Sequence, residues 1–209
     1  MFSLISNLPT SLMPDLDRIP EPWGSFLGEL DKMATDPVDF HCIGGFVVTG
    51  KYGFKRETND LGVLSITPKL QLQDFLNKGE KGSELHRKYR VYLDVVGVID
   101  VYPDAYEDRL TEMYPGQLKH IRLLAAEAHD LALMKLGRNN ERDREDVKFL
   151  ARLGFITPEE LNRRYIEEMR SYIAQAEQRY DPAMNLWVEM IREVLSNKTA
   201  GNSRTTALL

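Results

Sequence analysis

The spacing of apolar residues changes from short to helical repeats along the chain. Short apolar segments rich in Val, Ile and aromatic residues predict strands at 38–43, 61–67, 88–102 and 118–124. Between them, Trp23, Phe26, Leu27 and Leu30 recur at intervals of three and four, which predicts an amphipathic helix. Further helices are expected at 46–53 and 70–79. Strands that alternate with short helices predict an α/β or α+β core.

After residue 124 the repeat is helical throughout. Helices are predicted at 125–138, 144–154 and 157–180, followed by a last helix that carries Met184, Trp187, Val188 and Ile191. Thr157 is the expected N-cap of the third of these helices, with Glu160 completing a capping box. We therefore expect a mixed sheet core with an N-terminal arm at 1–124, a helical region at 125–196 and a disordered tail at 197–209.

Composition narrows the class of protein. Hydrophobic residues make up 43% of the 209 and charged residues 28%, as in soluble globular proteins. The formal charge of -5 argues against wrapping long nucleic acid by electrostatics alone. The single cysteine, Cys42, excludes an internal disulfide and is expected to be an inert core thiol. No segment has the length of a membrane span, and the N-terminus lacks the basic flank of a signal peptide, so a cytoplasmic location is expected.

A glycine pair ends the first predicted strand. Gly44 and Gly45 follow VDFHCI and precede a predicted helix. Backbone N–H groups at such a junction favour an anion such as a phosphate. The alternative is that the pair forms only a tight turn.

Carboxylates mark the next two strands. Side chains at positions 60 and 62 of a strand share a face, so a carboxylate at each position would suit a divalent cation. The chain has Asp60 but Gly62. Asp94, in the middle of an apolar strand, is the candidate for a further metal ligand, with Asp100 as the second choice. Either residue could instead cap a loop.

The helical region carries a lysine and an acidic pair. Lys135 lies on or beside an apolar helix face, and Asp143 and Asp146 lie one turn apart. In a cleft, Lys135 could neutralise phosphate charge. The alternatives are a lysine that extends to the surface and a solvated acidic face. The four histidines lack zinc-site spacing, and no nucleophile elbow or Walker A loop is present.

These motifs, in this order, resemble the minimal nucleotidyltransferases of the DNA polymerase beta superfamily, and among them the abortive-infection (AbiEii-type) and MenT-type toxins. The resemblance covers residues 41 to about 150 and rests on Gly44, Gly45, Arg56, Thr58, Asp60, Asp94, Lys135, Arg142, Asp143 and Asp146.

The resemblance implies a nucleotidyltransferase-like α+β fold and the transfer of a nucleotide from a nucleoside triphosphate to an acceptor. By this resemblance Gly44, Gly45, Arg56, Thr58 and Lys135 would hold the triphosphate, and Asp60 and Asp94 would hold Mg²⁺. Asp143 or Asp146 would orient the triphosphate or assist the acceptor hydroxyl. The acceptor would be RNA, such as a tRNA end, or a protein, and a cognate antitoxin would be a partner.

Position 62 departs from this family. The family pattern Asp-(Leu/Ile)-Asp reads Asp60-Leu61-Gly62 here, so one metal carboxylate is missing. Three explanations remain open. The chain could be a degenerate homologue that binds without turnover. It could be an active enzyme that recruits Glu57, Asp100 or Asp104. The residue could also have been substituted to silence a toxic activity.

Overall fold

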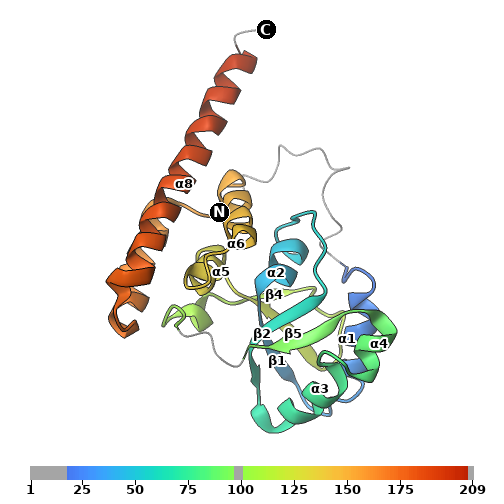
Figure 1. The fold of residues 1–209 in the computed structure, drawn as a ribbon. Coiled ribbons are helices and arrows are strands. Elements are labelled where there is room, and N and C mark those ends of the chain that lie inside the picture. The colour runs from blue at the N-terminus through green and yellow to red at the C-terminus, as the bar shows by residue number, and fades with distance from the viewer. Residues whose placement is uncertain (1–17, 97–100, 207–209) are drawn as a thin grey trace. The chain divides into compact units, whose positions relative to one another are not determined.

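A five-stranded mixed sheet forms the centre of the first part of the chain (Figure 1). The computed structural model describes residues 18–96 and 101–206. Its strands are β1 (Val38–Ile43), β2 (Asp60–Thr67), β3 (Tyr92–Val95), β4 (Thr111–Met113) and β5 (Ile121–Ala125), in the spatial order β3-β2-β1-β5-β4. Strand β1 runs antiparallel to β2 and parallel to β5, and β2 runs parallel to β3. The predicted α+β class with a mixed sheet is confirmed.

The chain forms two compact units. Among the described residues, the first unit comprises 18–95 and 112–125, and the second comprises 96, 101–111 and 126–206. The boundary predicted from the sequence at residue 124 lies next to Ala125, after which the chain enters the second unit. The membership of 101–111 in the second unit was not anticipated. In the described part, no helix combines the length and the hydropathy that crossing a bilayer requires.

In the described part of the first unit, four α-helices accompany the sheet: α1 (Trp23–Asp31), α2 (Gly44–Gly50), α3 (Leu72–Gly79) and α4 (Glu84–Tyr89). The predicted stripe of α1 is buried, with Phe26, Leu27 and Leu30 fully so. Helix α3 packs closely between α1 and β3, because a methyl group at Gly79 would lie 3.3 Å from Cβ of Leu93 and 3.4 Å from Leu30. The side of β3 that carries Leu93 therefore faces the core of this unit.

The segment predicted as one long strand at 88–102 is different in the structure. Its first residues belong to α4, which begins after Ser83 because the Ser83 side chain caps the backbone N–H of His86. Among the described residues the strand is only Tyr92–Val95. The expected bend at Gly97, together with Asp100, lies outside the described residues.

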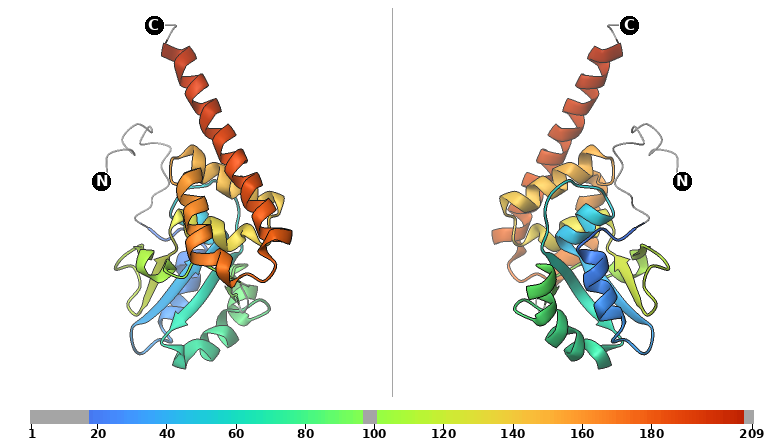
Figure 2. Two further views of the ribbon diagram at one scale, coloured as in Figure 1. Left: turned by 90° about the vertical axis from the view of Figure 1, so that its left-hand side faces the viewer. Right: turned by 90° about the vertical axis from the view of Figure 1, so that its right-hand side faces the viewer.

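The second unit contains α5 (Ala128–Leu136), α6 (Glu141–Arg152), α7 (Pro158–Arg164) and α8 (Ala176–Thr206). Helix α8 packs against α5, α6 and α7, as Figure 2 shows for α6 and α7 from two sides. The predicted stripe of the last helix is largely buried, with Met184, Trp187 and Ile191 at 0–1% exposure. Helix α8 includes 197–206, part of the segment expected to be a disordered tail.

The prediction of a single helix at 157–180 is wrong. Helix α7 continues as a π-helical segment, Tyr165–Met169, and a 3-10 turn, and the chain then reverses before α8. Asp181 of α8 holds the two sides of the reversal together, because it accepts a hydrogen bond from Tyr165 at 2.5 Å and pairs with Arg170 at 2.8 Å. Tyr172, which lies within the predicted helix, is 66% exposed.

Candidate functional site

The glycine pair lies where β1 ends and α2 begins. Gly44 has φ +72°, a backbone conformation that favours glycine, so the turn requires this residue. Helix α2 has only seven residues. Its dipole is therefore short, and a bound phosphate would need side chains for most of its stabilisation.

Two side chains of the loop between α2 and β2 supply such groups beside Gly45. A Cβ atom at position 45 would lie 2.8 Å from Nη2 of Arg56 and 2.9 Å from Oγ1 of Thr58. Glycine at this position thus lets a guanidinium and a hydroxyl approach the backbone at the start of α2. The Thr58 hydroxyl also donates to a carboxylate oxygen of Asp60 at 3.4 Å. Gly45, Arg56, Thr58 and Asp60 form one continuous cluster, which we call the Gly45 cradle.

Asp94 extends this cradle along the neighbouring strand. In the parallel pairing of β2 and β3, Gly62 is opposite Asp94 and Asp60 is opposite Tyr92. Paired positions and positions two apart share a face, so both carboxylates lie on the face away from Leu93. Partial burial and the negative charge of Asp60 raise the pKa of Asp94, while the charge of Lys81 lowers it. The structure therefore brings Asp60 and Asp94 together.

The third carboxylate of the family pattern has no substitute among the described residues. No group of three or more His, Cys, Asp and Glu side chains suited to a metal ion occurs there. Position 62 is also crowded, since a Cβ atom would lie 3.2 Å from the carbonyl oxygen of Ile43. An aspartate at position 62 would require Ile43 to move by a few tenths of an ångström.

A cavity of about 830 Å³ adjoins the cradle within the first unit. Arg56 and Thr58 are part of the Gly45 cradle and also line this cavity. The cavity has aromatic walls, including Trp23 and Tyr89, and its arginines include Arg90. Its size lies within the range of ligand pockets, which is roughly 300–1,000 Å³.

Lys135, Asp143 and Asp146 form a buried charge cluster in the second unit. Lys135 is 5% exposed and each aspartate 1%. The lysine forms an ion pair with Asp146 and lies 3.8 Å from Asp143, which Arg138 binds at 2.6 Å. The two alternative interpretations, a solvated acidic face for the aspartates and a lysine that extends to the surface, are therefore both wrong. The role of these three residues toward a triphosphate stays a prediction.

A second charge network in this unit was missed by sequence reasoning. Asp130, fully buried, accepts hydrogen bonds from Arg109 at 2.8 Å and from Arg164 at 2.9 Å. Glu127 binds Arg164 and His129, whose Nε2 accepts from the backbone N–H of Thr157. Except for Glu127 and His129, the paired residues are separated by 21 to 37 positions in the sequence. No local sequence pattern therefore reveals the network.

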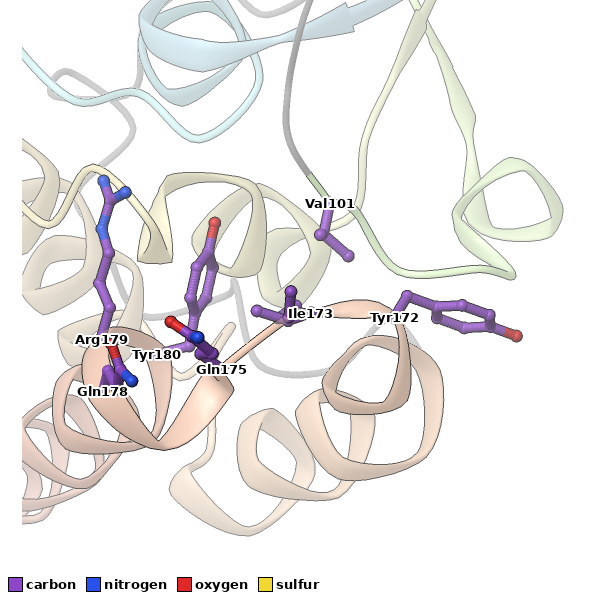
Figure 3. A pocket seen from close by; sticks show the side chains of 8 residues that line it. Val101, Tyr172, Ile173, Gln175, Gln178, Arg179 and Tyr180 are labelled. Carbon is purple, nitrogen blue, oxygen red and sulfur yellow. The ribbon is translucent and has the colours of Figure 1, made fainter.

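A smaller cavity of about 390 Å³ lies in the second unit, at the chain reversal before α8 (Figure 3). Gln175, with φ +54°, and Tyr180 are among its lining residues. Tyr172 lies at its edge, on the other side of Ile173 from Arg179 (Figure 3). None of the residues predicted for the site lines this cavity.

Cys42 is fully buried, as predicted, and burial raises the pKa of its thiol, so it takes no part in the site. Residues 26–195 match the sequence model of a family described as nucleotidyltransferase of unknown function (DUF6036). No curated protein and no solved structure matches the chain.

Proposed function

Because the chain belongs to this family of nucleotidyltransferases, we propose that its first unit binds a nucleoside triphosphate at the Gly45 cradle and transfers the nucleotide to an acceptor. The observation that carries the proposal is the convergence of Gly45, Arg56, Thr58 and Asp60, with Asp94 beside them. A guanidinium beside the backbone at the start of α2 suits phosphate oxygens, and the adjoining cavity offers room for the rest of a nucleotide.

The two strand carboxylates suit one Mg²⁺. Proteins commonly hold this ion through one or two carboxylates together with substrate phosphates. Asp60 and Asp94 provide this set, whereas the shared third carboxylate of a two-ion site is missing at Gly62. Bound there, the ion would supply positive charge against the triphosphate. We therefore propose a magnesium-dependent but weakened enzyme.

In the proposed reaction an acceptor hydroxyl oxygen forms a bond to the α-phosphorus. The bond from that phosphorus to the bridging oxygen breaks, pyrophosphate leaves, and the hydroxyl proton passes to solvent or to a carboxylate. Arg56 and Thr58 orient the phosphates for in-line attack. The acceptor that the resemblance implies is RNA, such as a tRNA end, or a protein.

The alternative is a nucleotidyltransferase fold that binds a nucleotide or a partner without turnover. The absence of a carboxylate at position 62 favours it. Losing one strong electrostatic group costs roughly a hundredfold to a thousandfold in rate. The two functions therefore differ in turnover.

Transfer of labelled nucleotide to RNA and to protein distinguishes them. We expect Gly62→Asp to increase transfer by about a hundredfold or more, and Asp60→Asn to abolish it in either background. Unfolding curves verify that crowding at Ile43 leaves the fold intact. Nucleotide binding without transfer in both the parent and Gly62→Asp would favour the binding module. Absence of nucleotide binding in both would overturn the proposal.

We extend the proposal to a toxin with a cognate antitoxin, since the resemblance implies both. Induced expression of Gly62→Asp should then arrest growth more strongly than the parent chain. The double variant with Asp60→Asn, which has the same crowding at position 62, is the matched control. Equal growth of all three strains would contradict a toxin role while leaving nucleotide transfer open.

A further inference from the structure

Lys81 lies in the first unit, beside the two strand carboxylates. It follows α3 and precedes α4, and its Nζ lies 5.7 Å from the centroid of the Tyr92 ring. Tyr92 is opposite Asp60 in the sheet and two positions from Asp94, so all three side chains share one face. The ring contact therefore brings the Lys81 ammonium to the face that carries both carboxylates.

This ammonium is available to a ligand. Lys81 is exposed, and among the described residues no carboxylate lies within ion-pair distance of it. The neighbouring lysines differ in this respect: Lys78 pairs with Glu84 at 2.8 Å and Lys88 with Glu29 at 3.7 Å.

Charge balance indicates what such a cation could do. A nucleoside triphosphate carries about four negative charges near neutral pH, and a two-ion site balances them with a second cation held by a shared carboxylate. With glycine at position 62, the pair of Asp60 and Asp94 suits only one ion. A fixed ammonium beside the pair would supply part of the charge that is then missing.

We propose that Lys81 binds a phosphate oxygen of the triphosphate and acts as a fixed cation in place of a second metal ion. The inference rests on the proposed function, because it needs a triphosphate at the Gly45 cradle. It adds a residue that is not among those predicted from the sequence to bind the triphosphate or the metal ion. It also offers an explanation of how a site with Gly62 could hold a triphosphate.

Titration calorimetry with a non-hydrolysable nucleoside triphosphate tests the proposal, first in EDTA and then in saturating Mg²⁺. In EDTA, Lys81→Gln should weaken binding about tenfold, as expected for loss of one charge-assisted hydrogen bond. Lys81→Arg should retain most of the affinity. Lys78→Gln removes the same charge from an ion-paired neighbour and should change affinity less than about twofold.

The Gly62→Asp background gives the sharper result. There a second Mg²⁺ can bind, so Lys81→Gln should cost much less in saturating Mg²⁺ than it does in the parent chain. Because Lys81 is exposed, the unfolding midpoint should stay unchanged. Equal affinities of Lys81→Gln and Lys78→Gln for the triphosphate would overturn the proposed role of Lys81 but not the proposed function. A parent chain that binds no triphosphate would overturn the proposed function, and this inference with it.

Discussion

A side chain at position 45 and a side chain at position 62 would meet different neighbours, although both positions border the candidate site. At position 45 an added methyl group meets the functional groups of Arg56 and Thr58 below 3.0 Å. At position 62 it meets the backbone of Ile43 at 3.2 Å. Substitution at position 45 therefore disturbs the ligand-binding groups themselves, whereas substitution at position 62 disturbs the packing between two strands.

Gly45→Ala should weaken triphosphate binding about tenfold with little loss of stability, because the methyl group displaces a guanidinium and a hydroxyl. Calorimetric titration measures the affinity. Gly28→Ala is the matched control: a Cβ atom there meets nothing within 4 Å, and α1 should gain about 0.5–1 kcal/mol. Unchanged affinity in Gly45→Ala would show that phosphates bind elsewhere.

The buried pair of Lys135 and Asp146 should be essential for the stability of the second unit, whatever its role in chemistry. Asp146→Asn leaves the buried ammonium with only the more distant Asp143, which Arg138 already binds, and we expect a loss of about 3 kcal/mol. Urea denaturation followed by circular dichroism measures it. Glu189→Gln, on the exposed side of α8, should change stability by less than about 0.5 kcal/mol. A comparable small effect in both variants would indicate that the pair is not buried in solution.

Among the elements, α6 depends on its first turn. The Asn140 side chain accepts from the backbone N–H of Asp143, and the Asp143 carboxylate accepts from the backbone N–H of Asn140. This capping box fixes the start of the helix that presents both buried aspartates.

Asn140→Ala should therefore destabilise the protein by about 1 kcal/mol, as measured by urea denaturation. Asn140→Asp should retain most of the stability, since aspartate is an equally good N-cap. A loss in Asn140→Asp as large as that in Asn140→Ala would contradict a capping role.

Elements with a strong repeat were predictable from the sequence, and their ends and partners were not. The stripe of α1 and the strand β1 lie where the pattern puts them. Helix α4 was not predicted, and its last two residues were assigned to a strand, because the start of the helix depends on one cap, Ser83. The reversal before α8 depends on Asp181, which binds residues 11 and 16 positions earlier. A periodicity cannot report such contacts.

In the candidate site, too, residues with local contacts were predictable from the sequence and residues with long-range contacts were not. Order and residue type pointed to Gly45, Arg56, Thr58 and Asp60, whose contacts are local in the chain. Lys81 was not among the residues predicted to bind the triphosphate or the metal ion, because its place beside β3 depends on the approach of α3 and α4 to that strand. The arginine partners of Asp130 were hidden for the same reason.

At the scale of the whole molecule, stability should fall in acid. Burial would raise the pKa of Glu127, but hydrogen bonds from His129 and the charge of Arg164 outweigh it and hold the pKa at about 2 against the ordinary 4.5. A carboxylate with a depressed pKa in the folded state stabilises fully above its unfolded value. That contribution is lost as the pH falls from about 4.5 to about 2.

Glu127→Gln should flatten this part of the stability profile, measured as unfolding free energy against pH. Glu189→Gln, at an exposed position on α8, is the control and should leave the slope as in the parent. An identical acid slope in Glu127→Gln and the parent would contradict the depressed pKa.

The place of β5 in the sheet has a consequence during synthesis. It lies directly beside β1, yet it is the last strand of the unit to be made. Until Ala125 has left the ribosome, β1 exposes a row of backbone amides and carbonyls that its neighbour will later satisfy. A nascent chain that stalls before this point therefore presents an open template to chaperones or to other copies of itself.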